Sequence, residues 1–405
     1  MINEPAPARP GPLRLTYAAM AANLAGTGLG RFAYTPLIPA LIAAQWLTPG
    51  QAGLAAAANL PGYLAGAVLA QRMTVWAGPS LTLRVNLLIA TASFFACAVP
   101  VSAAWFSLWR ALAGASGAVL MVVAAPTALA RVRADRRGLA GGVMFGGVGL
   151  GVVASGSVVP WVLPWGLTAT WATLGVLSTV LTISAWSAWP SEGRAAATPA
   201  TAPAQRGGLW SPALLAVYAL YGLNAAGVVP HMVYLADYVA RGLGQGIERA
   251  AIYWVLFGLG AVVGPPVLGP CADRFGFGHT LRALLLVEIA SVLAVLVTAH
   301  PVALAASSFV VGGLISGIVP LVLGIVQRLL PGEVPRQRAS WSIATACFAL
   351  GLAGGGYGYA CVFAHTGSHL LLFGIGAGAL VLCFAAHVVS EILMRRAQPT
   401  AGATP

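Results

Sequence analysis

Charged residues are scarce in this chain of 405 residues, and lysine is absent altogether. All 21 basic residues are arginines, and charged residues make up only 7% of the total. A soluble globular domain carries about 25% charged residues, so this chain cannot cover a water-facing surface and is predicted to be an integral membrane protein. Without lysine it also cannot form a Walker A loop, which needs Gly-Lys-Ser/Thr to hold phosphates. This excludes an ATP-driven motor within the chain.

Cysteine is rare as well, and its placement argues against a metal site. The five cysteines have no CxxC pair and no histidine at ligand spacing; they are Cys97, Cys271, Cys347, Cys361 and Cys383. This pattern favours small apolar fillers over a disulfide framework or a zinc site. We expect no metal and no cofactor.

Hydrophobic residues are abundant, at 59%. A crossing needs about 20 apolar residues, and the runs between Pro, Gly and Arg predict twelve spans. These spans lie at 15–44, 52–71, 81–103, 104–130, 139–163, 166–188, 210–239, 250–270, 281–299, 302–330, 339–363 and 368–393. Glycines recur within them at small-xxx-small spacing, as in Gly62/Gly66 and Gly260/Gly264, which lets helix backbones approach closely in lipid.

A Pro/Ala/Thr/Gly-rich segment at 189–209 lacks apolar periodicity and is interpreted as a linker that divides the spans six and six. A weak repeat, in which Asn23 aligns with Asn224 and Gly26 with Gly227, supports this division. Two related six-helix halves are a known transporter plan. The predicted fold class is therefore all-α integral membrane, with twelve transmembrane helices in two six-helix halves. The predicted parts are a tail (1–14), a first half (15–188), the linker (189–209), a second half (210–393) and a tail (394–405).

The arginines predict the orientation of the spans. If the N-terminus is cytoplasmic, only Arg241 and Arg249 fall in outer loops, Arg31 and Arg110 lie within spans, and all the others are on the inside. With an even number of spans, both termini are then cytoplasmic. The protein is expected in the inner membrane. The formal charge of +12 is thus a topology signal, and no nucleic-acid partner is expected.

Arg31 is the sharpest candidate for a binding residue. Asn23, Thr27, Arg31 and Tyr34 follow i, i+4, i+8 and i+11 spacing, which places them on one face of an otherwise apolar helix and indicates a water-lined cavity. Arg110, near the start of the fourth span, is expected at similar depth. No acid lies within the first six spans, and buried unpaired charge is costly, so we expect an anionic guest. The alternative is that both arginines reach outward to lipid headgroups or cap helix-end carbonyls.

A second polar stripe lies in the seventh span and consists of Tyr221, Asn224, His231 and Tyr238. His231 titrates near neutral pH in its ordinary state and is a candidate proton carrier, although a hydrogen-bonded core histidine is equally consistent. Asp237 is expected at the outer mouth, where gating or plain solvation outweighs a proton relay. Glu288 and His387 have no polar stripe around them and are interpreted as structural.

Between the eighth and ninth spans the chain forms a helix end, a glycine turn and a carboxylate beside arginines. The residues concerned are Gly269, Asp273, Arg274, Gly276 and Arg282. An aspartate here pairs with an arginine or sits at a helix N-terminus, which makes the loop a breakable cytoplasmic latch.

These residues resemble motif A of the major facilitator superfamily. The first-half copy, read at Gly66 to Arg72, has Gln71 where the family has Asp, and Arg110-Ala-Leu-Ala-Gly114 is similar to the family's helix 4 signature. The segments 28–39, containing Gly28-Leu-Gly-Arg31, and 339–351, beginning Ala339-Ser-Trp341, resemble the YbfB/YjiJ-type branch. The resemblance implies that helices 1, 4, 7 and 10 line a central cavity.

The sequence therefore predicts a monomeric secondary transporter, not an enzyme, that moves a small organic solute, expected to be anionic, by alternating access. Arg31 and Arg110 would bind the anionic group, Asn23, Thr27, Tyr34 and Asn224 would shape the site, and His231 would contact substrate or carry a proton with Asp237. One alternative is efflux of hydrophobic or cationic drugs, although cationic cargo usually needs an acid in the cavity. Another is a non-transporting membrane sensor, which predicts a soluble domain or a loop longer than 189–209.

Overall fold

The computed structural model describes residues 11–34, 37–189 and 208–397, and within these ranges every regular element is helical. The first half contains α1 (Pro12–Asn23), η1 (Leu24–Leu29), α2 (Gly30–Phe32), α3 (Ile38–Ala43), α4 (Pro49–Cys97), α5 (Ala103–Leu129), η3 (Ala134–Arg136), α6 (Arg137–Val162), η4 (Leu163–Trp165) and α7 (Leu167–Trp186). The second half contains α8 (Pro212–Val229), η7 (Pro230–Tyr234), α9 (Leu235–Asp237), η8 (Tyr238–Gly242), α10 (Gly246–Phe275), α11 (Phe277–Val297), α12 (Pro301–Leu329), α13 (Val334–Thr366) and α14 (His369–Ala397).

These helices make twelve spans, as predicted. Ten helical stretches of the described chain are long and apolar enough to cross a membrane. One of them, in α4, is two spans folded back at Gly78, whose φ of +79° suits glycine. The remaining span is the run α1–η1–α2, which is interrupted by a π-helical segment at η1.

The first span is shorter than its predicted range of 15–44, because α2 ends at Phe32 and the short α3 follows as a separate helix. Pro39 lies in the first turn of α3, where proline is tolerated because the N–H that it lacks would have no helical partner. The predicted linker 189–209 and the tails 1–14 and 394–405 lie largely outside the described residues. The domain boundaries therefore stay predictions.

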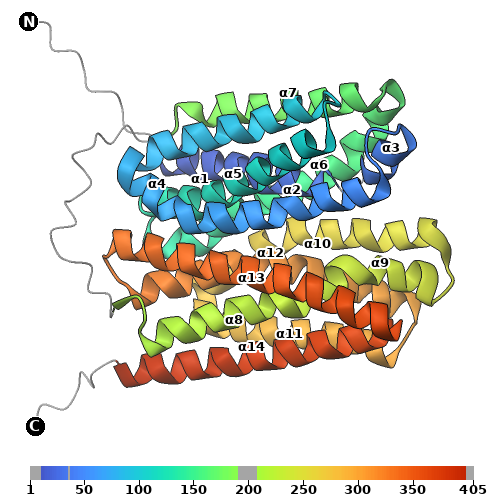
Figure 1. Cartoon of the computed structure of the whole chain (residues 1–405). Coiled ribbons are helices and arrows are strands. Elements are labelled where there is room, and N and C mark those ends of the chain that lie inside the picture. The colour runs from blue at the N-terminus through green and yellow to red at the C-terminus, as the bar shows by residue number, and fades with distance from the viewer. Residues whose placement is uncertain (1–10, 35–36, 190–207, 398–405) are drawn as a thin grey trace, which may run out of the picture.

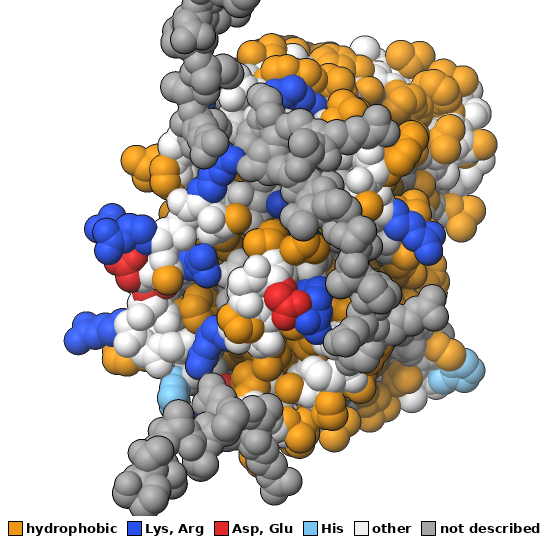
Figure 2. All heavy atoms as spheres, turned by 90° about the vertical axis from the view of Figure 1, so that its left-hand side faces the viewer, with side chains coloured by type: hydrophobic (Ala, Val, Ile, Leu, Met, Phe, Trp, Pro, Cys, Tyr) orange, Lys and Arg blue, Asp and Glu red, His pale blue; other side chains and the backbone are white. Residues whose placement is uncertain are grey.

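The two six-helix halves lie side by side, with α1 to α7 in one layer and α8 to α14 in the other (Figure 1). The described chain begins and ends at the same side of the bundle, which we call the terminal end, and we call the opposite side the far end. Figure 2 looks onto the terminal end and shows basic side chains spread over it, with hydrophobic side chains along its border.

Glycines set the close approach of neighbouring helices. A Cβ added at Gly62 or Gly66 of α4 would lie 2.1 Å from the carbonyl oxygen of Ala111 or Ala115 of α5. In the second half, a Cβ at Gly264 would lie 2.0 Å from a main-chain oxygen of α12. The spacing noted in the sequence therefore brings backbones into direct contact, as expected for helices packing in lipid.

A hydrophobic cluster joins the two halves. It contains residues of both halves, including Leu15 and Leu129 from the first and Leu214 and Leu330 from the second. The remaining clusters each belong to one half. The structure is thus closed at the terminal end.

Candidate functional site

A narrow cavity lies between the halves, in the middle of the bundle. It is lined by residues of both halves: Thr27, Arg31, Phe32, Tyr63, Met121, Phe145, Val148, Val152, Met232, Phe257, Ala261, Ile315, Ser316, Val319, Phe348 and Leu352. Its open volume is about 60 Å³, and a water molecule takes about 30 Å³ of liquid. The cavity is therefore nearly closed and must widen to admit an organic solute.

Arg31 is the one charged residue of this lining. Among the described residues, its guanidinium makes no hydrogen bond and no ion pair, and it lies 5.6 Å from the ring centre of Phe32 and 5.8 Å from that of Tyr63. The face of an aromatic ring attracts a cation, but this attraction replaces only part of the stabilisation that the guanidinium would gain from hydration in water. Within the part of the chain that the structure describes, the cavity thus holds a positive charge without a negative partner.

Arg110 is not among the residues that line this cavity in the structure, and its contact with substrate stays a prediction. Its Nη1 donates to the carbonyl oxygen of Gly30 at 2.6 Å, its Nη2 donates to that of Arg31 at 3.4 Å, and its Cζ lies 4.7 Å from the ring centre of Tyr34. The guanidinium therefore caps the carbonyl end of α2, as in the alternative considered from the sequence. This contact fixes the backbone that carries Arg31.

Only Thr27 and Arg31 of the first polar stripe reach the cavity. Asn23 donates from Nδ2 to the oxygen of Met144 at 3.0 Å, and the Tyr34 hydroxyl donates to that of Ala52 at 2.9 Å. The predicted common face assumed an uninterrupted α-helix, whereas η1 is π-helical, with i→i+5 bonds, and turns the later residues relative to Asn23.

The second stripe also turns away from the cavity. Asn224 donates from Nδ2 to Oε2 of Glu288 at 2.6 Å, and Nε2 of His231 lies 2.8 Å from Oγ of Ser307. Met232 lines the cavity instead. A π-helical segment, η7, begins at Pro230, after Asn224, so it shifts only the residues that follow, and Asn224 faces Glu288 from the regular helix α8.

Glu288 has no polar stripe on its own helix, and the sequence therefore indicates a structural role. In the structure its carboxyl group accepts a hydrogen bond from Asn224, a residue of the predicted site, between α11 and α8. A signal was available in the sequence, because a membrane-embedded acid requires a partner.

Asp237 lies toward the far end, as expected, but not in the cavity. Its Oδ2 is 2.7 Å from Nε2 of His369, at the start of α14, so the pair connects the seventh and twelfth spans within the second half.

Asp273 joins the halves at the terminal end. Its two carboxylate oxygens accept hydrogen bonds from the main-chain N–H groups of Gly138 and Leu139, at 2.7 and 2.8 Å, at the N-terminus of α6. A carboxylate there satisfies free N–H groups and interacts favourably with the helix dipole. Gly269 contacts the same turn so closely that a Cβ on it would lie 2.2 Å from the oxygen of Gly138.

The remaining latch residues shape the turn after Asp273. Gly276 has φ +85°, which favours glycine, and the Arg274 guanidinium lies 5.4 Å from the ring centre of Phe275. Nε of Arg282 is buried without a hydrogen-bond partner among the described residues. Of the two arrangements considered for the aspartate, the structure has the helix N-terminus.

The first-half copy of this loop lies further along the chain than predicted. Gly78 has φ +79° and ψ 157°, close to the +85° and 148° of Gly276, and the sequences Thr-Leu-Arg at 82–84 and at 280–282 follow the two glycines at the same distance. Matching the turns places Val75, which is 65% exposed, where the second half has Asp273. The first half therefore has no carboxylate at the position equivalent to Asp273. That position is Val75, not Gln71 as predicted.

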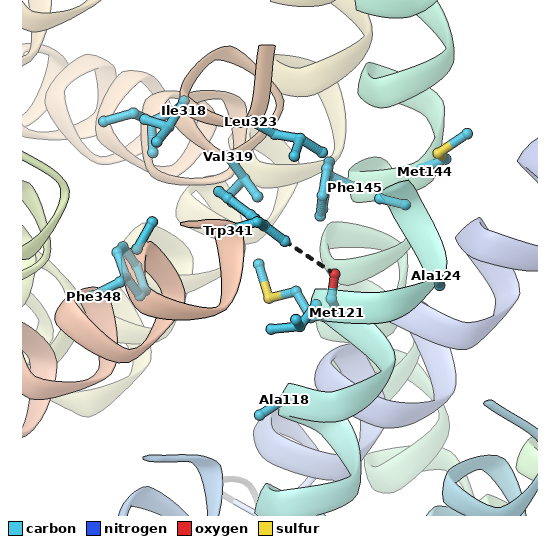
Figure 3. Close-up of a cluster of buried hydrophobic side chains, with 14 of the residues drawn as sticks. Ala118, Met121, Ala124, Met144, Phe145, Ile318, Val319, Leu323, Trp341 and Phe348 are labelled. Atoms are coloured by element: carbon cyan, nitrogen blue, oxygen red, sulfur yellow. Dashed lines mark hydrogen bonds between the residues drawn. The ribbon is translucent and has the colours of Figure 1, made fainter. Parts of the chain in front are cut away.

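Trp341 closes the terminal end of the cavity. It lies fully buried on α13, stacks on Tyr221 with ring centres 5.7 Å apart, and meets Phe145 of the other half edge to face at 6.4 Å. Its Nε1 donates to the oxygen of Met121 at 3.5 Å, again across the halves (Figure 3). Phe145 and Met121 both line the cavity, so Trp341 lies directly behind its wall.

Residues 23–388 match the protein family described as "Uncharacterised MFS-type transporter YbfB". The chain belongs to this family, within the major facilitator superfamily, and is a multi-pass membrane protein. It is 29% identical over 373 residues to a "Chloramphenicol resistance protein" of Streptomyces lividans, covering 89% of this chain and 91% of the relative.

Solved structures of the superfamily share the fold. The E. coli fucose:proton symporter FucP superposes with a TM-score of 0.70 at 15% identity, covering 96% of this chain and 98% of that chain. A bacterial homologue of the iron transporter ferroportin, in an outward-facing state, gives 0.71 at 13% identity, covering 94% and 99%. The proton:xylose symporter XylE gives 0.73 at 15% identity, covering 96% of both chains.

Proposed function

We propose that this chain is a secondary transporter for small amphipathic organic anions, which moves them across the inner membrane by alternating access. The observation that carries the proposal is the unpaired guanidinium of Arg31 in the cavity between the halves. A guanidinium binds a carboxylate or sulfonate through parallel N–H donors, most strongly where water is excluded.

The rest of the lining indicates that the anion is apolar apart from its charged group. Apart from Arg31, Thr27, Ser316 and the Tyr63 hydroxyl, the cavity is lined by aliphatic, aromatic and methionine side chains. A sugar needs many polar partners, and each hydroxyl buried without one is costly. An aromatic or aliphatic acid fits this chemistry better, with one charged end against Arg31.

Both termini are proposed to be cytoplasmic. The arginines of the connecting turns at the terminal end support this orientation, because cytoplasmic loops carry an excess of arginine. In this orientation, Asp273 and Trp341 hold the cytoplasmic side closed. Release to the cytoplasm requires both contacts to break.

The test is ligand binding by the purified protein in lipid nanodiscs, with 2-naphthoate as the anionic probe and 2-naphthamide as its uncharged match. Loss of a charge-assisted contact costs about 1.5–3 kcal/mol, so Arg31→Ala should weaken 2-naphthoate binding roughly 10- to 100-fold. The affinity for 2-naphthamide should stay unchanged. Arg31→Lys should retain part of the affinity, because it keeps the charge and loses the fork.

Arg133→Ala is the matched control, since it removes an exposed arginine at the terminal end that pairs with Asp135, two residues along the chain. Undiminished binding of 2-naphthoate by Arg31→Ala would contradict the site assignment.

A second candidate function is efflux of uncharged aromatic compounds, which the Streptomyces lividans relative supports by its name. The apolar lining suits such cargo without help from Arg31. The same assay separates the two, with chloramphenicol as a further probe. If chloramphenicol binds the parent and Arg31→Ala equally while 2-naphthoate does not bind, the second candidate is the correct one.

Proton coupling through His231 or Asp237 stays a prediction. His231 is fully enclosed and bonded to Ser307, and Asp237 is paired with His369. Neither contacts the cavity, so each would have to act through a movement of the seventh span.

A further inference from the structure

Glu288 is the one acid that is fully buried among the described residues. It lies near the middle of α11, and its Oε2 accepts a hydrogen bond of 2.6 Å from Nδ2 of Asn224 on α8. No arginine or histidine of the described chain bonds this carboxyl group. An isolated carboxylate in such surroundings costs several kcal/mol, so the geometry favours the neutral acid.

The hydrogen-bond inventory of the pair points the same way. Oε1 of Glu288 and Oδ1 of Asn224 are both buried, and neither has a partner among the described residues. An ionised carboxylate and an amide oxygen are acceptors only, whereas a protonated carboxyl group carries one O–H donor. Adding one proton to Glu288 therefore turns one of two unmatched acceptors into a donor.

Few groups near Glu288 could stabilise the negative charge that its carboxyl group would carry without the proton. The titratable group nearby is the Cys383 thiol of α14, which donates to the oxygen of Leu220 at 3.2 Å. From α8 the facing polar group is the uncharged Asn224, and α10 and α12 bring no charged group of the described chain into contact. Release of the proton therefore requires that water reach the carboxyl group.

Asn224 connects this group to the transport cycle. It lies on the seventh span, and further along the same span Met232 lines the cavity. A movement of this span relative to α11 would change both the cavity lining at Met232 and the contact between Asn224 and Glu288. The carboxyl group can thus be sealed in one state and hydrated in another.

We propose that Glu288 is the proton-carrying group of this transporter, an inference that rests on the proposed transport function. In the closed arrangement Glu288 holds one proton on its carboxyl group. When the seventh span separates from α11, the O–H bond breaks, the proton passes to water, and the carboxylate is hydrated. Reprotonation from water on the other side of the membrane restores the neutral acid.

The protonation of Glu288 is measured without any substrate. Infrared difference spectra of the nanodisc-embedded protein, recorded across a pH titration, report the carbonyl stretch of protonated carboxyl groups. The parent should show a titrating acid band that Glu288→Gln removes and His387→Gln, the control at another buried ionisable residue, keeps. Asn224→Asp should hold the band to higher pH, because two adjacent carboxyl groups share a proton. A band unchanged in Glu288→Gln would overturn the assignment.

The transport role is tested with naphthalene-2-sulfonate, whose charge does not change with pH. In proteoliposomes, an imposed pH gradient should drive the parent to accumulate the probe above its equilibrium level. Glu288→Gln should only equilibrate it, while still exchanging labelled for unlabelled probe at the parental rate. Accumulation by Glu288→Gln equal to that of the parent would contradict the proposal. Failure of the parent to take up the probe would instead contradict the anion-transport function, and the infrared result would still decide the protonation of Glu288.

Discussion

The guanidinium of Arg110 donates a hydrogen bond of 2.6 Å to the main-chain oxygen of Gly30, the residue before Arg31. One arginine of the membrane interior is thus used to hold the backbone that presents the other. The two charges have different surroundings: Arg110 is 3% exposed and bonded to carbonyls, whereas Arg31 lines the cavity without such a bond among the described residues.

This difference predicts the effect of Arg110→Lys. The lysine keeps the charge but lacks the second donor arm, so one of the carbonyls of Gly30 and Arg31 loses its partner, at a cost of about 1–3 kcal/mol. We expect a lower melting temperature in nanodiscs and weaker binding of 2-naphthoate than in the parent. The loss of affinity should be smaller than that of Arg31→Ala, because Arg31 is still present. An affinity lost to the same extent in both variants would show that Arg110 itself contacts the ligand.

The Asp273 contact predicts a local change at the start of α6. Asp273→Asn removes the charge that accepts from the N–H groups of Gly138 and Leu139, a loss of about 1–2 kcal/mol. These amides should then exchange with deuterium roughly 5- to 30-fold faster, as measured by mass spectrometry of peptides covering 134–145. Asp135→Asn is the control, since that acid is exposed and paired with Arg133 in the neighbouring turn. Equal exchange in Asp273→Asn and the parent would mean that the contact does not hold the halves together.

The sequence predicted the number and type of the spans well, because their signals are local. Apolar length, glycine spacing and the turn around Gly276 each act within one helix or one connection. The predicted common face of the first polar stripe is not formed because the π-helical turn at η1 changes the phase of the helix between Asn23 and Arg31, and the residue pattern does not mark such a turn. The partner of Asn224 was missed for a different reason: Glu288 lies on another helix, and only the packing of α11 against the bundle brings the two side chains together.

The terminal-end closure predicts a specific defect for Trp341→Ala. This substitution removes the ring contacts with Tyr221 and Phe145 and the hydrogen bond to Met121, and a large-to-small change in a packed core costs about 3–5 kcal/mol. Because two of these contacts cross between the halves, the closed state should lose stability relative to states open at the terminal end. We expect faster leakage of preloaded naphthalene-2-sulfonate from proteoliposomes, together with a lower melting temperature.

Trp105→Ala is the matched control: Trp105 also donates from Nε1 to a main-chain oxygen and contacts a ring edge to face, but both partners, Ala96 and Trp109, lie in its own half. Leakage that rises equally in both variants would reflect general loosening of the bundle, whereas leakage confined to Trp341→Ala identifies this side chain as the barrier between the cavity and the terminal end.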